Sequence, residues 1–95
     1  MKRVAAIIVP DIDYATLTPG AIELHDDGLY YVCPCGCKAV SYLPFKPAPS
    51  PSWSWDGNRE RPTLEPSVHH RLRDADGKLG ETHWHGWLRA GVWMA

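Results

Sequence analysis

The chain has 95 residues and a formal net charge of -1 with neutral histidines. A chain of this length can build only one hydrophobic core, so we expect a single domain over residues 1–95. It contains no block of Lys or Arg and no apolar run approaching the roughly 20 residues of a membrane span. We therefore expect neither a nucleic acid nor a membrane as its partner.

The N-terminal segment is basic and then apolar, as in a signal peptide. Its apolar run, Val4 to Val9, is too short for the hydrophobic region of such a peptide, and Pro10 and Asp11 follow in place of a cleavage site. All three cysteines lie between Cys33 and Cys37, a spacing that cannot form the disulfide framework of a secreted protein. These features predict a first strand and a cytoplasmic location.

The rest of the chain predicts short strands. No helical apolar period lasts for three turns, and alternating stretches recur between turn residues. We expect a mainly β fold, a small antiparallel sheet or meander stabilised by zinc, with little or no helix. The predicted strands are Arg3–Val9, Ala21–His25, Leu29–Val32, Ala39–Leu43, Ser52–Trp55, Ser67–Arg71, Thr82–Arg89 and Gly91–Met94, with turns at Asp26–Gly28, Asp74–Gly77 and Arg89–Gly91. The proline-rich stretch Pro44–Pro51 should be an extended surface connection.

The first motif that could carry chemistry is Cys33-Pro34-Cys35-Gly36-Cys37. Proline and glycine favour a turn that brings the thiolates together, and thiolates favour zinc in a four-ligand tetrahedral site. A redox or iron-binding use, or free thiols, are the alternatives.

A fourth ligand must come from another part of the chain. His83 and His85 lie two residues apart in a predicted strand, so they share a face and either can reach an ion. One can also ligate while the other does different work, and both can be surface histidines. His25, before a turn, is a reserve ligand. The adjacent pair His69 and His70 should face opposite ways and not act together, and we expect neither to be a ligand.

Ser67 follows a rigid stretch between Pro62 and Pro66. A serine becomes a nucleophile only with a base in hydrogen-bond reach and donors for the oxyanion, and otherwise a serine here is a strand-entry residue.

The tryptophans have two possible roles. Trp53 and Trp55 share a strand face whereas Trp84 and Trp87 do not, and they either fill the core or form an exposed binding patch.

The order of these motifs resembles one known family. Its pattern is carried by Cys33–Cys37, the proline-rich step, Trp53–Gly57, Thr63–Val68 and His85–Gly91, within residues 29–93. The chain resembles a family of small zinc-binding bacterial and phage proteins, sometimes mislabelled ammonia monooxygenase, whose bacterial members are associated with ubiquitin-like conjugation operons. The resemblance implies a zinc-stabilised β fold and a peptidase that processes or deconjugates a ubiquitin-like protein, its protein partner.

Carried over to this chain, the resemblance makes Ser67 the nucleophile and His85 the general base. Many bacterial relatives have a fourth cysteine where this chain has Thr82, a poor zinc ligand. His83 is the natural substitute, which gives a metal site of Cys33, Cys35, Cys37 and His83. Asp56 and Glu65 are candidates for a third catalytic residue.

Two other functions fit the same residues. A non-enzymatic zinc module of the kind a phage could encode would bind a partner protein through exposed tryptophans and the proline-rich segment. A catalytic zinc would hydrolyse directly, although three thiolates make the metal a weak Lewis acid. The sequence predicts neither the substrate nor the oligomeric state.

Overall fold

The computed structural model of the protein describes the backbone of residues 3–73 and 79–95, and the side chains of residues 3–70 and 84–95. This described part contains strands and no helix, so it has no helix that could cross a membrane. The strands are β1 (Arg3–Ala5), β2 (Ile7–Val9), β3 (Ala21–His25), β4 (Gly28–Val32), β5 (Val40–Pro44), β6 (Ser54–Trp55), β7 (Leu64–Glu65), β8 (Val68–Arg73), β9 (Leu79–Arg89) and β10 (Val92–Met94). The expected mainly β fold with little or no helix is confirmed.

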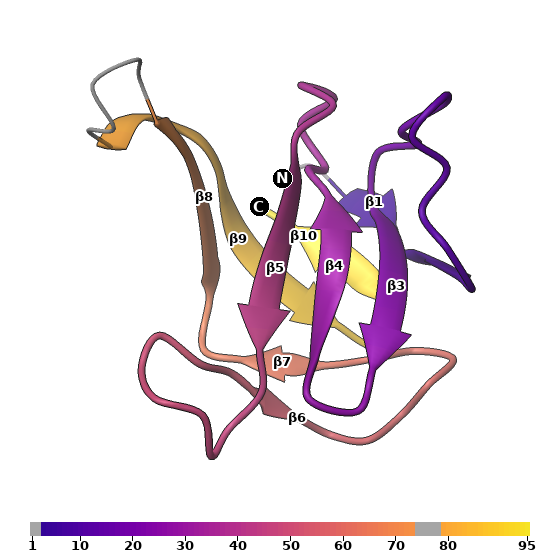
Figure 1. Ribbon diagram of the computed structural model, residues 1–95, viewed down its shortest axis with the longest axis vertical. Helices are drawn as coiled ribbons and strands as arrows, with labels where there is room; N and C mark the ends of the chain where they lie inside the picture. Colours follow the sequence, from indigo (N-terminus) through magenta and orange to yellow (C-terminus); the bar gives the residue numbers. More distant parts are fainter. Residues whose placement is uncertain (1–2, 74–78) are drawn as a thin grey trace.

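The strands form two four-stranded sheets and a small ribbon. One sheet has the order β1-β10-β9-β8, the other β2-β3-β4-β5, and β6 pairs with β7. Figure 1 shows the second sheet in front of the first, with the β6–β7 ribbon across their lower end. All pairs within the sheets are antiparallel except β2 with β3, which are parallel. The fold is therefore a mixed rather than a purely antiparallel arrangement.

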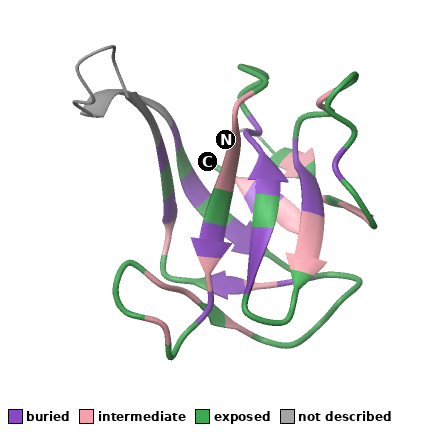
Figure 2. Ribbon diagram, in the orientation of Figure 1, coloured by how far each residue is buried: buried purple, intermediate pink, exposed green. Residues whose placement is uncertain are grey.

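The hydrophobic core lies between the two sheets. Figure 2 shows buried positions on strands of both sheets, and from Trp84 to Arg89 buried and exposed residues alternate, because successive side chains point to opposite faces of a sheet. Trp93 is fully buried, its indole N-H donates to the Gly20 carbonyl at 3.0 Å, and its ring lies 5.1 Å from Tyr31 and 5.5 Å from Trp84. The buried core residues are Ile22, Leu29, Tyr31, Cys33, Leu43, Phe45, Leu64, Val68, Trp84, Leu88 and Trp93.

The first predicted strand is in fact two. Residues 3–9 contain β1 and β2, which belong to different sheets, and Ala6 lies where the chain crosses between them. The Ala6 N-H donates to the Gly91 carbonyl at 2.9 Å, whereas the next N-H, of Ile7, donates to Gly20 at 3.3 Å. Val4, Ala6 and Ile8 nevertheless all pack against the core. The continuous apolar run from Val4 to Val9 therefore predicted one strand and could not show that the segment joins both sheets.

The other predicted strands are present with shifted ends. Ala21–His25 agrees with β3 residue for residue, while β9 begins at Leu79, before the predicted Thr82, and Leu64–Glu65 forms a short strand that the sequence pattern did not reveal. The proline-rich stretch begins within β5, whose last residue is Pro44, and continues as a connection to β6. The turn predicted at Asp74–Gly77 lies outside the described residues.

The β8–β9 hairpin is irregular. Its register runs from Arg73 opposite Leu79, through Arg71 opposite Thr82, to His70 opposite Trp84, with shifts between these pairs. Between the last two pairs, β8 advances by one residue and β9 by two, so β9 carries an extra residue, His83. Strict alternation does not hold across such a bulge. The inference that His83 and His85 must share a strand face therefore loses its basis.

Replacing the central indole tests this description of the core. Trp93→Ala should lower the free energy of unfolding by about 3–5 kcal/mol, because a large cavity replaces packed contacts. Trp87→Ala is the control, because Trp87 lies in the adjacent strand but is 39% exposed, and should cost about 1 kcal/mol or less. Urea unfolding followed by circular dichroism measures both. Equal losses would contradict the placement of Trp93 between the sheets.

Candidate active site

Ser67 and His85 lie side by side on the sheet that contains β8 and β9. Ser67 immediately precedes β8, and His85 is in β9. The distance from Ser67 Oγ to His85 Nε2 is 3.1 Å, within hydrogen-bond reach. His85 is exposed and Ser67 half-buried, so both are open to solvent. The two residues that the family resemblance made nucleophile and base are thus in mutual contact.

Strand alternation and cross-strand pairing orient His85. Trp84, Gly86 and Leu88 are buried, so His85 and Trp87 between them point away from the core. His69 lies directly opposite His85, with ring centroids 4.8 Å apart, and the Trp87 ring lies 6.0 Å from the His85 ring. The imidazole of His85 is therefore flanked by two rings that restrict its rotation.

The backbone of Ser67 is held by Trp53, which follows the proline-rich stretch in the chain. The Trp53 indole N-H donates to the Ser67 carbonyl at 3.2 Å. Trp53 is itself fixed by its backbone N-H, which donates to the Pro44 carbonyl at 2.9 Å. This contact anchors the end of the proline-rich connection beside the serine, a role for Trp53 that the sequence pattern did not reveal.

Neither carboxylate considered as a third catalytic residue contacts His85. Asp56 Oδ1 accepts hydrogen bonds from the backbone N-H groups of Asn58 at 3.0 Å and Thr63 at 3.3 Å, so it closes its own loop. Glu65 is exposed in β7, where its backbone pairs with β6. Within residues 3–70 and 84–95, no Asp or Glu side chain is hydrogen-bonded to His85. Among the described side chains, His85 therefore contacts Ser67 and the rings of His69 and Trp87.

The three cysteines form a cluster in the loop between β4 and β5. Their sulfur atoms lie within 4.8 Å of one another, and Cys33 and Cys35 are 3.2 Å apart. Thiolates that share a tetrahedral zinc with bonds of about 2.3 Å lie about 3.8 Å apart, so the spacing suits one ion. Gly36 has a φ of 89° and Lys38 a φ of 65°, a left-handed path that folds the loop back on itself. This cysteine cluster could therefore hold a metal ion.

Cys33, the buried member of the cysteine cluster, lies where a negative charge is unfavourable. Burial raises the pKa of the Cys33 thiol well above its ordinary value, so a bound cation would be needed to hold it as thiolate. Burial, together with the nearby cysteines, also raises the pKa of Tyr31. The Tyr31 hydroxyl lies 3.2 Å from Nδ1 of His70, which is itself buried. A buried Tyr31–His70 pair thus connects the region of the cysteine cluster to β8.

The remaining histidines lie in β3, β8 and β9. His25 lies 2.6 Å from the Glu23 carboxylate on β3 and is not in the cysteine cluster. His69 and His70 face opposite sides of β8, as expected, and neither belongs to the cluster. The side chain of His83, the expected fourth ligand, lies outside the described residues. Of the side chains that the structure describes, only the three cysteines form a group that could hold a metal ion.

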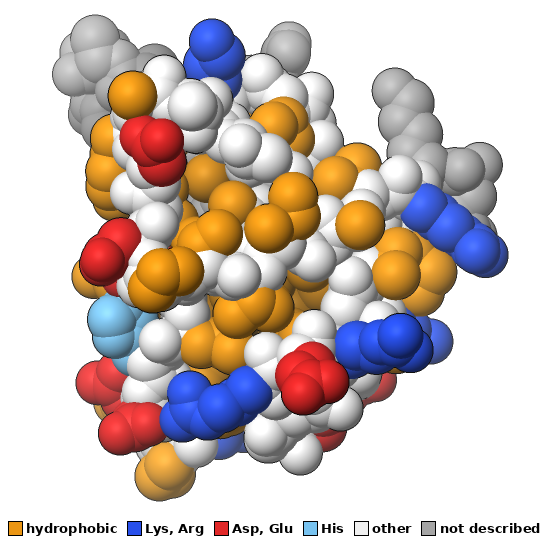
Figure 3. Space-filling model, turned by 90° about the vertical axis from the view of Figure 1, so that its right-hand side faces the viewer, with side chains coloured by type: hydrophobic (Ala, Val, Ile, Leu, Met, Phe, Trp, Pro, Cys, Tyr) orange, Lys and Arg blue, Asp and Glu red, His pale blue; other side chains and the backbone are white. Residues whose placement is uncertain are grey.

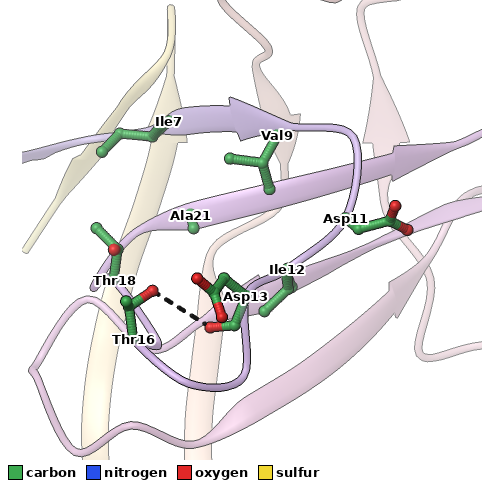
Figure 4. A pocket seen from close by; sticks show the side chains of 8 residues that line it. All are labelled: Ile7, Val9, Asp11, Ile12, Asp13, Thr16, Thr18 and Ala21. Atoms are coloured by element: carbon green, nitrogen blue, oxygen red, sulfur yellow. Dashed lines mark hydrogen bonds between the residues drawn. The ribbon is translucent and has the colours of Figure 1, made fainter.

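A small pocket lies on a different part of the molecule. Figure 3 shows apolar side chains gathered on the face that is seen from the right of Figure 1. The pocket, about 100 Å³ in volume, is formed by β2, β3 and the loop between them. As Figure 4 shows, its lining combines Ile7, Val9 and Ala21 with the hydroxyls of Thr16 and Thr18, and Thr16 donates to the Asp13 carbonyl at 3.4 Å. Neither Ser67 nor His85 lines it, so it is no part of the Ser–His site.

The fold and the site together define a small β protein with a solvent-accessible Ser–His pair and a separate thiol cluster. Comparison with known families agrees with this class. The model of the family described as "Bacterial ubiquitination-like system serine protease (BubE)" matches residues 9–95, so the chain belongs to this family. No curated protein and no solved structure matches the chain.

Metal analysis tests the cysteine cluster. We expect the purified protein to carry a single bound metal ion and Cys35→Ser to lose it, because removing one thiolate opens a site of this kind. Elemental analysis, with titration of free thiols before and after chelation, measures both. Ser41→Ala, a substitution in neighbouring β5 that removes no thiol, is the control. A metal content unchanged by Cys35→Ser would exclude this cluster as the site.

Proposed function

We propose that the protein is a serine-type peptidase that cleaves a peptide or isopeptide bond at the C-terminus of a ubiquitin-like protein. The observation that carries the proposal is the 3.1 Å distance between Ser67 Oγ and His85 Nε2 on an open face. The family description, a serine protease of a bacterial ubiquitination-like system, supports the reaction class and the kind of substrate.

The chemistry follows from the two side chains. Ser67 Oγ attacks the scissile carbonyl while His85 Nε2 takes the hydroxyl proton, which gives a tetrahedral oxyanion. His85 then returns that proton to the leaving amine, the C–N bond breaks, and an acyl ester remains on Ser67. Water, deprotonated by the same nitrogen, attacks the ester and releases the carboxylate product and free Ser67. Each proton taken is returned, so the enzyme ends in its starting state.

No carboxylate among the described residues is hydrogen-bonded to His85, so we propose that neighbouring rings orient its imidazole. In a Ser-His-Asp triad the acid fixes the tautomer and stabilises the imidazolium. Here the cross-strand ring of His69 and the ring of Trp87 restrict the imidazole, and its Nε2 has the serine as hydrogen-bond partner.

We further propose that Cys33, Cys35, Cys37 and His83 hold a zinc ion with a structural role. Three thiolates and an imidazole form a closed tetrahedral set, and such a set leaves no position for a reactive water. The cysteine loop and the β7–β8 junction that carries Ser67 lie at opposite ends of the sheets (Figure 1). Because His83 precedes His85 by two residues in β9, a metal-bound His83 would fix the strand that presents the catalytic base.

The central test is removal of each reacting group. Ser67→Ala and His85→Ala should each reduce cleavage of a reporter fused to the C-terminus of the ubiquitin-like protein of the same system by about 10³-fold or more. Both variants should remain folded, since both positions contact solvent. Ser54→Ala, an exposed serine in β6, should cleave at the wild-type rate. Retained activity in Ser67→Ala would contradict the assignment of the nucleophile.

A covalent probe shows whether Ser67 is reactive even when the substrate chosen for the cleavage assay is wrong. A fluorophosphonate should attach to Ser67 of the wild-type protein, because the reagent needs an activated serine and no particular substrate. Peptide mass spectrometry should place the adduct on Ser67, and His85→Ala should lose the labelling. An unlabelled wild-type protein would favour the second function considered, a zinc module that binds its partner through exposed side chains such as Trp87, 39% exposed.

The structural role of zinc makes a separate prediction. Removal of the ion by a strong chelator should destabilise the fold, because sites of this kind contribute roughly 10–16 kcal/mol of apparent binding free energy. His83→Ala should weaken zinc binding measured by competition with a chromophoric chelator. His69→Ala, which changes a histidine outside the cysteine cluster, should leave zinc affinity unchanged. Equal zinc affinity for His83→Ala and the wild type would exclude His83 as a ligand.

A further inference from the structure

The sheet that carries the Ser–His pair has an outer face, which is the side of β1, β10 and β9 turned away from the core. Trp87 and Arg89 point to this face because the intervening Leu88 is buried. Their β10 partners Met94 and Val92 share it, and Arg3 of β1 lies opposite Met94. The outer face is thus continuous with His85 along a single strand.

The charged side chains at the described positions of the outer face are all positive. The Arg89 guanidinium lies 5.9 Å from the centre of the exposed Trp87 ring, an arrangement that holds the cation in place. Neither Arg3 nor Arg89 forms an ion pair with any residue of the described part. The described positions of this face on β1, β9 and β10 include no Asp or Glu, although the whole chain has a net charge of -1. A positive, partly apolar strip therefore adjoins the reacting atoms.

We infer that this strip, formed by Trp87, Arg89, Val92, Met94 and Arg3, docks an acidic segment of the protein substrate. The inference rests on the proposed function, because it takes Ser67 and His85 as the point where the scissile bond lies. Arg89 is four residues beyond His85 on an extended strand, a distance of about 13–14 Å. An extended peptide covers the same distance in about four residues, so the acidic side chains should lie about four residues from the cleaved bond.

The physical basis is charge complementarity with some apolar contact. An acidic segment would place carboxylates against Arg89 and Arg3, while its backbone or an apolar side chain packs on Trp87 and Met94. Exposed ion pairs of this kind discriminate modestly, so we expect each arginine to change affinity by up to about fivefold, and the effect to fall with salt. The strip would therefore select among substrates and add nothing to the chemical step.

Peptide binding to Ser67→Ala tests the strip without relying on cleavage. The probes are fluorescein-labelled peptides of the ubiquitin-like C-terminal segment, in which the residues about four positions from the cleavage point are all Glu, all Gln or all Lys. Fluorescence anisotropy at low salt should rank their affinities Glu, then Gln, then Lys. Arg3→Glu/Arg89→Glu, made in the Ser67→Ala background, should invert that order, with the Glu peptide losing about tenfold or more in affinity.

A matched control comes from the second arginine–tryptophan pair. Arg59 lies 5.7 Å from the Trp55 ring but belongs to the loop between β6 and β7, where it pairs with Asp26 at 3.2 Å and is not one of the residues of the strip. Arg59→Glu should leave the ranking of the peptides unchanged. Equal affinities for the Glu and Gln peptides, or an equal effect of Arg59→Glu, would overturn the docking inference.

The outcomes for docking and catalysis are separable. Wild-type enzyme that cleaves all three peptides with equal kcat/KM would retain the peptidase and refute the acidic docking strip. A Glu preference in binding to Ser67→Ala, with no cleavage of any peptide by the wild type, would retain the strip and refute the peptidase. In the expected case the double charge reversal raises KM for the Glu peptide and leaves kcat unchanged.

Discussion

The pairing of β8 with β9 is the constraint on which the candidate active site depends. A regular ladder continued from Arg73 opposite Leu79 would place His83 opposite His69, but the two register shifts place His85 there instead. Ser67, just before β8, then contacts His85 diagonally rather than directly across the ladder. Bulges commonly re-aim side chains next to active sites, and here they decide which histidine of β9 meets the serine.

The same strand must satisfy the core on its other side. Trp84 and Gly86 both face inward, and the Trp84 indole lies across the space that a side chain at position 86 would occupy. A Cβ at Gly86 would also collide with the Met94 carbonyl of the neighbouring chain segment. The Trp84 ring therefore fits in the core only because residue 86 is a glycine. This fit fixes β9 against β10 and so fixes the outward direction of His85 and Trp87.

Much of this arrangement could be predicted from local sequence. The strand pattern predicted β3 with its observed ends and placed Trp84 and Trp87 on opposite faces of β9, and the tight cysteine spacing predicted the thiol cluster. Sequence did not predict that residues 3–9 join both sheets, because Val4 to Val9 is one continuous apolar run with no break at the crossing residue Ala6. The contacts around Ser67 were equally hidden, since they join β8 to Trp53 through a backbone carbonyl and to β9 through a shifted register. Long-range register has no local signature in the sequence.

The proposed metal site and the proposed catalytic site meet in one strand, β9. A chain of this size has little core with which to hold a reacting side chain rigidly. In this scheme the buried face of β9 is fixed by the packing of Trp84 on Trp93, and the preceding residue, His83, is held by zinc. His85 directly follows these two anchors, so its backbone is restrained even though its side chain is exposed. Rigidity at the base would then come from the strand, and the rings of His69 and Trp87 need only limit rotation of the imidazole.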